Sequence, residues 1–162
     1  MRRILMVGTA ASLVGLAALG SMGSAQGQHS EAEAVRAAAS AFYAVLNARD
    51  IRAMESLWAQ DADPIMIHPS GPFARSPAIG WEAVRRSFTE AWPRFAEWSV
   101  RVDDMRVRVG QEGAVVLATT PVHVKMQGED AVHDYTALAT ILYERRGDRW
   151  LIVHEHVSQP PR

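Results

Sequence analysis

The chain has 162 residues, which suits one domain with its own core and leaves little room for a second. Seventeen Lys and Arg against 18 Asp and Glu give a net charge of -1, so no basic surplus points to a nucleic-acid partner. The absence of cysteine excludes disulfides and the lipid-modified cysteine of a lipoprotein.

The first 25 residues have the composition of a cleavable export signal. Arg2 and Arg3 precede an apolar run over residues 4–19, and a stretch of small residues ends at Ala25. We expect cleavage before Gln26, which makes the protein exported, either periplasmic or secreted. An uncleaved anchor is the alternative, but the run is shorter than the roughly 20 apolar residues of a membrane span. We therefore expect no stable membrane insertion after cleavage.

Three segments of the mature chain have helical periodicity. Residues 26–30 form an expected linker, and apolar residues then recur every three or four positions over residues 31–48. Asp50 is placed to cap a second helix, which we expect to end before Pro64. The third helix begins at Trp81 and carries an aromatic face, and Pro93 is expected to end it.

The other regular segments alternate apolar and polar residues, as strands do. A slip in this alternation at Asp103 and Asp104 predicts a β-bulge, which bends a sheet. The interval 69–80 is rich in proline and glycine and is expected to be a loop. The expected strands cover residues 65–68, 98–102, 105–109, 114–126, 132–144 and 150–158.

This order of elements predicts an α+β domain over residues 31–158, followed by a tail over 159–162. Three N-terminal helices should pack on a strongly bent, mostly antiparallel sheet. A bent sheet with helices across its mouth would enclose a pocket.

The same order, with three local matches, resembles the nuclear transport factor 2-like superfamily. The matches are Phe42-Tyr43-Ala44-Val45-Leu46-Asn47-Ala48-Arg49-Asp50, Gly80-Trp81-Glu82-Ala83-Val84, and residues 146–158 with their Trp-x-x-Val-His-x-His-x-Ser pattern. The similar branches are the SnoaL-like domains and the association domain of calcium/calmodulin-dependent kinase. The resemblance implies a cone with a central pocket for a small-molecule ligand, and a homodimer formed through the sheet. It implies no single activity, because members include isomerases, cyclases, hydratases, dehydratases and binding modules.

The steroid isomerase branch of that superfamily is a poor match at its catalytic positions. Its carboxylate base falls on His68, its helical tyrosine on Phe42, and its late carboxylic acid near Thr140. The reaction of that branch needs a tyrosine hydroxyl and a neutral carboxylic acid as oxyanion donors. Steroid isomerisation is therefore not expected.

His68 is the main catalytic candidate, because it ends a strand beside a loop where side chains commonly face a cavity. Imidazole with a pKa near ~6.5 can act as a general base or acid. The structural alternative is a histidine that bonds the loop backbone. No glycine-rich phosphate loop opens a helix, so no cofactor is expected.

His154 and His156 should share one strand face with Trp150 and Ile152, because side chains alternate along a strand. With a third ligand such as His123 they could bind a metal, but no carboxylate cluster accompanies them, and we expect no metal. We place all three histidines among the expected ligand-binding residues.

Asp134 is a second catalytic candidate if it points inward and orients a histidine, and a solvated hairpin charge if it points outward. The aromatic residues fit either the core or an apolar pocket wall. The remaining expected ligand-binding residues are Tyr43, Trp58, Trp81, Phe88 and Tyr135.

The sequence thus favours an exported domain that binds a small, mostly apolar molecule and performs cofactor-free acid/base chemistry, if any. The rival hypothesis is a non-catalytic association module whose sheet forms a dimer. A metal-dependent enzyme is the third.

Overall fold

The computed structural model describes residues 17–61, 63–68 and 77–159, with side chains from residue 27 onwards. Most of the expected export signal lies outside the described residues, as do most of the expected loop over 69–80 and the end of the tail. None of the described helices is long and apolar enough to cross a membrane.

The helices are α1 (Ala17–Ala48), α2 (Ile51–Glu55) and α3 (Trp81–Ala91), and a 3₁₀ turn, η2 (Trp92–Arg94), follows α3. Helix α1 begins before residue 31 and passes through the expected linker at 26–30. The Asp50 carboxylate accepts hydrogen bonds from the backbone N–H groups of Arg52 and Ala53, and so caps α2 as expected. Helix α2 is a single short turn rather than the longer helix expected.

Seven strands form one sheet, and all neighbouring pairs are antiparallel except β1 and β7, which are parallel. The order across the sheet is β2-β1-β7-β6-β5-β3, and β4 also pairs with β5. The strands are β1 (Ile65–Ile67), β2 (Ala78–Ile79), β3 (Phe95–Val100), β4 (Asp104–Val109), β5 (Gly113–Met126), β6 (Val132–Arg146) and β7 (Arg149–Ser158).

The slip at Asp103 and Asp104 is a break between two strands, not the bulge expected within one. Strand β3 pairs with the second half of β5, and β4 pairs with its first half. The backbone N–H groups of Arg101 and Asp103 still donate to carbonyls of β5, at 3.0 Å each. The chain therefore follows one edge of β5 throughout, changing direction between β3 and β4.

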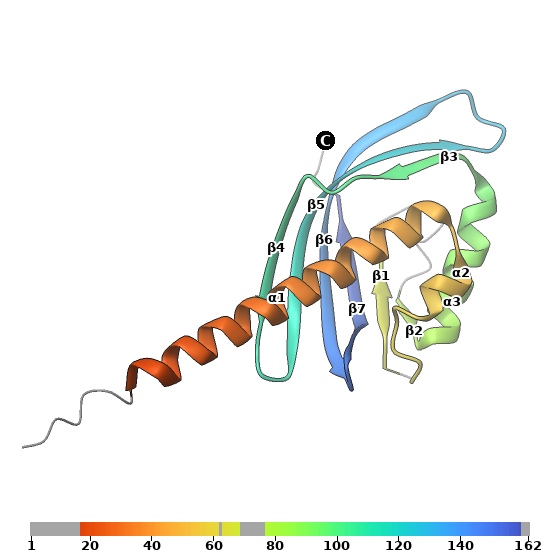
Figure 1. The fold of residues 1–162 in the computed structure, drawn as a ribbon. Coiled ribbons are helices and arrows are strands. Elements are labelled where there is room, and N and C mark those ends of the chain that lie inside the picture. Colours follow the sequence, from red (N-terminus) through yellow and green to blue (C-terminus); the bar gives the residue numbers. More distant parts are fainter. Residues whose placement is uncertain (1–16, 62, 69–76, 160–162) are drawn as a thin grey trace, which may run out of the picture.

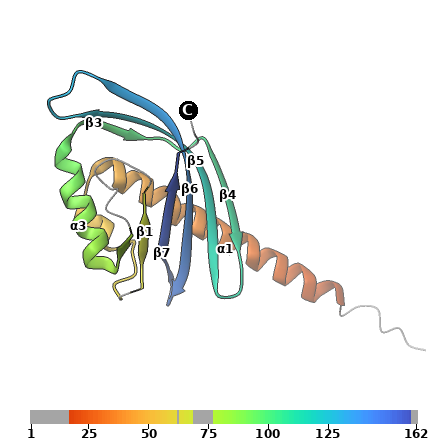
Figure 2. The same cartoon turned by 180° about the vertical axis from the view of Figure 1, so that it is seen from behind.

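The sheet is strongly curved, and α1 crosses its concave side (Figure 1). Strands β5 and β6 bend along their length, so that their far ends arch with β3 over the C-terminal part of α1 (Figures 1 and 2). Helices α2 and α3 lie together at that end. The α+β class and the bent-sheet architecture expected from the sequence are confirmed.

The two faces of the sheet differ in burial. On β5, residues at even positions such as Val116 and Val124 are buried, and residues at odd positions such as Leu117 are partly or fully exposed. Pairing in register carries this alternation to β6, where Ala137 and Ile141 are buried. We call the buried side the inner face and the opposite side the outer face.

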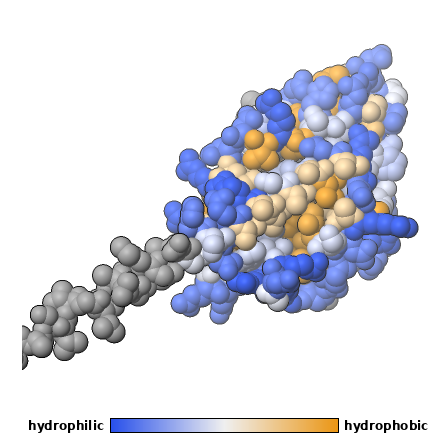
Figure 3. Space-filling model, in the orientation of Figure 1, coloured by the Kyte–Doolittle hydropathy of each residue, from blue (hydrophilic) through white to orange (hydrophobic). Residues whose placement is uncertain are grey.

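The main core lies between the inner face and the helices. Phe42 of α1 and Phe88 of α3 are fully buried there, and so is Trp58, which follows α2. Phe88 packs edge-on against Trp58, with ring centroids 6.4 Å apart. The side of α1 that faces solvent carries a row of exposed alanines, which appear as a pale band along the helix in Figure 3. They include Ala34, Ala37, Ala41, Ala44 and Ala48.

Asn47 fixes the C-terminal end of α1 to the sheet. Its side-chain amide donates to the carbonyl of Val100, and its carbonyl oxygen accepts from the N–H of the same residue, both at 2.8 Å. Each such hydrogen bond contributes on the order of 1 kcal/mol. This pair holds the last turns of α1, including Tyr43, over the second half of β5.

Strand β7 contains a one-residue irregularity that decides which of its side chains face inward. Leu142 pairs with His154 but Tyr143 pairs with Ile152, so Val153 is an extra residue between two regular stretches. Because side chains alternate along a strand, the extra residue exchanges the two faces of β7. Before the irregularity Ile152 points to the inner face, and after it Glu155 points to the inner face.

Candidate functional site

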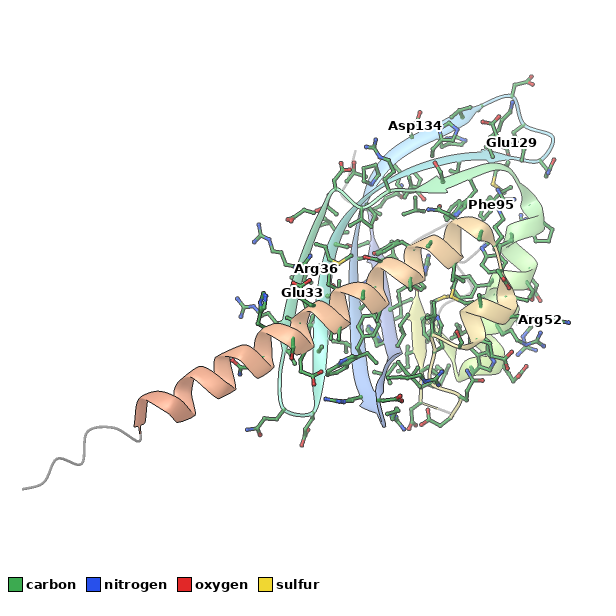
Figure 4. All side chains as sticks on the ribbon, in the orientation of Figure 1. Glu33, Arg36, Arg52, Phe95, Glu129 and Asp134 are labelled. Carbon is green, nitrogen blue, oxygen red and sulfur yellow. The ribbon has the colours of Figure 1, made fainter. Side chains whose placement is uncertain are left out.

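A cavity of about 560 Å³ lies between the inner face of the sheet and the C-terminal part of α1. Its walls are apolar for most of their extent, and its volume lies in the ~300–1,000 Å³ range of small-molecule sites. Figure 4 shows Phe95 and Glu129 at the end of the molecule where β3 meets the β5–β6 turn. The apolar lining residues are Leu46, Phe95, Trp98, Val100, Val122, Val124, Met126, Ala137, Ala139 and Val157.

Two adjacent parallel strands bring an imidazole and a carboxylate together in this cavity. Met66 of β1 is in register with Glu155 of β7, and His68 follows two residues later, which places it on the same face as Met66. Nε2 of His68 lies 3.4 Å from Oε2 of Glu155. Their side chains are 14% and 4% exposed, so the pair is largely shielded from water.

Glu155 is one of only two buried polar residues among the described part of the chain. A carboxylate that is removed from water needs a partner, since an isolated buried charge is very costly. The only hydrogen bond that the described residues give Glu155 is the one with His68. The two side chains therefore depend on each other electrostatically.

Two tyrosine hydroxyls are buried near this pair. Tyr43 of α1 lines the cavity, and Tyr143 lies on the inner face of β6. Neither hydroxyl has a hydrogen-bond partner among the described residues. Burial raises the pKa of both phenols well above the ordinary value near 10, and the charge of Glu155 raises each further. Tyr43 therefore stays protonated and can donate a hydrogen bond into the cavity.

Three of the site residues expected from the sequence line this cavity: Tyr43, His68 and Tyr135. Three others lie in the core instead and are absent from the cavity lining. Trp58 and Phe88 are fully buried and pack on each other, and Trp81 at the start of α3 is buried at 5% exposure.

His123 and Asp134 lie on the outer face of the sheet, and the cavity is on the other side. Nδ1 of His123 is 2.8 Å from Oδ1 of Asp134, and its Nε2 is 3.3 Å from Oε2 of Glu97. These two carboxylates raise the pKa of His123, chiefly through the hydrogen bond that Asp134 accepts from it. Asp134 does orient a histidine, but both groups lie on the outer face and neither lines the cavity.

His154 and His156 also lie on the outer face, in register with Leu142 and Thr140 of β6. The inference that they share a face with Trp150 and Ile152 was wrong, because Val153 interrupts the alternation. Burial lowers the pKa of His154, and the neighbouring His156 lowers it further.

Glu155 is the residue that the sequence reasoning missed. The sequence did carry a signal for it, a charged residue between two histidines on an apolar strand. An acidic side chain in such a strand is either solvated or buried with a partner. The alternation drawn from Trp150 and Ile152 assigned the cavity wall to His154 and His156 instead. Only the pairing of β7 with β6 and β1 corrects that assignment.

The described residues contain no group of three His, Cys, Asp or Glu side chains placed to hold a metal ion. The chemistry that the site itself offers is proton transfer by the imidazole, with a carboxylate to orient it and a neutral phenol to donate a hydrogen bond.

Comparisons with known proteins agree with the fold. A family model described as a SnoaL-like domain matches residues 35–162. A solved structure from Streptomyces avermitilis, a nuclear transport factor 2-like protein provisionally assigned as a dehydratase, is 23% identical with a TM-score of 0.70. The match covers 80% of this chain and 97% of that one.

Two further solved structures are similar. One is a protein from Thiobacillus denitrificans provisionally assigned as a calcium/calmodulin-dependent kinase association domain, with 26% identity, coverage of 78% and 94%, and a TM-score of 0.61. The other is a hexachlorocyclohexane dehydrochlorinase from Novosphingobium barchaimii, with 16% identity, coverage of 82% and 88%, and a TM-score of 0.69. The comparison with curated proteins finds no match.

The tyrosines provide a direct test of the buried site. The chain has three, and the pKa of each is raised, by burial in every case. A raised folded-state pKa means that stability is fully present below the unfolded value near 10 and is lost as pH rises above it. We expect no phenolate absorbance at 295 nm near pH 10, and its later appearance together with loss of the circular dichroism signal. A phenolate signal near pH 10 from a folded protein would contradict the burial of the tyrosines.

Proposed function

We propose that this chain, which belongs to the SnoaL-like domain family, binds a small, mostly apolar molecule in the cavity and transfers a proton on it without a cofactor. The observation that carries the proposal is the contact between His68 and the buried Glu155 at one wall of an otherwise apolar cavity. Imidazole next to a buried carboxylate is a common arrangement for general base catalysis.

The roles of the two residues follow from their contact. In the tautomer in which Nε2 of His68 donates to Glu155, the other ring nitrogen carries the lone pair that can accept a proton. The carboxylate fixes this tautomer and stabilises the imidazolium that forms when the proton is accepted. Glu155 acts through His68 in this step, and His68 is the group that contacts the substrate.

Tyr43 supplies the second part of the site. The residue lines the same cavity, and its neutral, buried hydroxyl has no partner among the described side chains and backbone groups. A buried donor of this kind can hold a substrate oxygen, where negative charge develops when a neighbouring carbon loses a proton. The three residues together suit proton abstraction next to a carbonyl, or the first step of an elimination.

The names of the similar proteins support this class of reaction. Dehydration and dehydrochlorination both remove a proton from carbon, and a base is needed for that step in each. At the identities found, those likenesses show the fold alone, so the proposal rests on the residues of this chain.

The proposal predicts that the protein accelerates hydrogen–deuterium exchange at C2 of 1-tetralone, a compact bicyclic ketone. The His68→Ala variant should lose the acceleration by ~10²-fold or more, because a positioned base typically contributes ~10²–10⁴-fold. Proton NMR of the ketone in deuterated buffer measures the rate directly.

His123→Ala is the matched control, since it removes an imidazole from the outer face, away from the cavity. Its exchange rate should stay close to that of the unmodified protein. If no ketone of this size exchanges faster with the protein than without it, while the ketone still binds, the catalytic part of the proposal is wrong.

We also propose that the protein is exported and that residues 1–25 are removed. The composition of that segment supports this, and the loss of these residues would cost α1 no described core contact. The first buried side chain among those described in α1 is Val35. Residues 27–30, just after the expected cleavage point, are exposed.

Export predicts a specific mass. Protein recovered from the periplasm or the medium should be lighter than the full chain by the mass of residues 1–25, with Gln26 at its N-terminus. Intact mass spectrometry measures this. A full-length chain found only in the cytoplasm would contradict the export proposal.

We propose in addition that two copies associate through the outer face. The middle of this face, over β5 and β6, carries only uncharged outward side chains, and Leu117 and Leu138 are 50% and 49% exposed there. Exposed apolar side chains gathered on one sheet face are typical of an interface. The likeness to a provisionally assigned association domain agrees with this.

The dimer predicts that Leu138→Arg produces a monomer, because it places two charges, one per copy, inside the interface. Light scattering during size-exclusion chromatography would show the mass fall from two chains to one. Ile79→Arg is the control, since Ile79 is more exposed but lies on β2, at the far end of the strand order from β5 and β6. An unmodified protein that is monomeric at tens of micromolar would contradict the proposal.

The dimer is compatible with both a catalytic and a purely associative protein. A non-catalytic association module remains the second candidate, favoured by the exposed leucines of the outer face. The buried Glu155 favours the catalytic candidate, because an associative role gives no reason to keep a carboxylate at the wall of an apolar cavity.

A further inference from the structure

The charged groups around the cavity are distributed unevenly. Glu155 is 3% exposed, while Glu129 and His133 are exposed residues at the turn and start of β6. Arg94 of η2 is also exposed. Charges in contact with water are screened, but the charge of Glu155 is enclosed by apolar side chains and is screened far less.

His68 is the one basic side chain in contact with Glu155 among the described residues. When His68 is neutral, as a general base must be before it accepts a proton, the pair carries one net negative charge. The field inside the cavity is then negative, and it acts through apolar walls formed by residues such as Trp98 and Val122.

Tyr43 alone does not decide between two kinds of ligand. Its hydroxyl could donate equally well to the oxygen of a ketone and to the oxygen of a carboxylate. Both ligands could have the same apolar body and fill the same volume. Only the second adds a negative charge close to Glu155.

Building on the proposed function, we infer that Glu155 makes the cavity exclude anions. The substrate is then an uncharged, largely apolar molecule with a hydrogen-bond acceptor oxygen for Tyr43. A carboxylate or phosphate of the same shape is rejected, because it would place a second negative charge in a site from which water is largely excluded. Glu155 therefore has two roles in one place, orienting His68 and selecting ligands by charge.

Three compounds of nearly the same shape test this inference: 1-tetralone, 1,2,3,4-tetrahydro-1-naphthoate and 1-aminotetralin. They are respectively uncharged, anionic and cationic at pH 7.5. Binding is measured by isothermal titration calorimetry. We expect the ketone to bind ~10-fold or more tightly than the anion, which corresponds to a modest electrostatic penalty.

Glu155→Gln keeps the shape of the side chain and removes its charge. We expect this variant to bind the anion and the ketone within about three-fold of each other, mainly because the anion gains affinity. Glu82→Gln is the matched control, because Glu82 is an exposed carboxylate on α3 outside the cavity lining. It should keep the preference of the unmodified protein.

The outcomes separate the two proposals. Equal binding of ketone and anion to the unmodified protein would overturn the exclusion of anions and leave the cavity as a ligand site. If the cation binds more tightly than the ketone, the inference that the substrate is uncharged is wrong. If none of the three binds the unmodified protein or Glu155→Gln, the proposed function fails as well.

A folding defect in Glu155→Gln would not prevent the test. Glu155→Asp keeps the charge within the same wall, so it should still prefer the ketone to the anion even if both bind more weakly. Loss of the preference in a folded Glu155→Asp variant would count against the inference. Thermal melting by circular dichroism identifies which variants are folded.

Discussion

The contact between His68 and the buried carboxylate of Glu155 is the interaction on which the rest of the site depends. A carboxylate inside an apolar wall requires a positively polarised neighbour, and β1 supplies one only because it runs parallel to β7 and in register with it. Burial raises the pKa of Tyr43, which lines the cavity, and the same carboxylate raises it further. Three elements that are distant in the sequence are thus coupled by one buried charge.

Most of the architecture could be predicted from the sequence. The apolar spacing of α3, the capping carboxylate of Asp50 and the alternation of β5 each depend on neighbouring residues, and the SnoaL-like resemblance is confirmed by the family match. The short length of α2 was harder to predict from the sequence, because it depends on how Trp58 packs in the core. In the sequence, the break between β3 and β4 was visible only as a slip in the apolar–polar alternation. Its form depends on how both strands pair with β5.

The candidate site was predictable in part. The position of His68 at the end of a strand was sufficient to choose it, and Tyr43 followed from the expectation that an aromatic side chain with a polar end can line an apolar pocket. Which histidines of β7 point inward was not predictable, because the alternation of a strand can be extrapolated only while its register is unbroken. The extra residue Val153 leaves no mark in composition or spacing, and so His154 and His156, rather than Glu155, were expected at the ligand site.

That extra residue also bears on how such a cavity could change over time. If the irregularity stays at Val153, one residue inserted between Val153 and His154 would bring His154 and His156 to the wall in place of Glu155. Deleting Val153 would instead leave Glu155 facing inward. A single codon gained in this strand would thus exchange an acidic wall for a basic one while the apolar body of the cavity stayed the same. An insertion, which is usually regarded as damage to a sheet, is here a short evolutionary route between ligands of opposite charge.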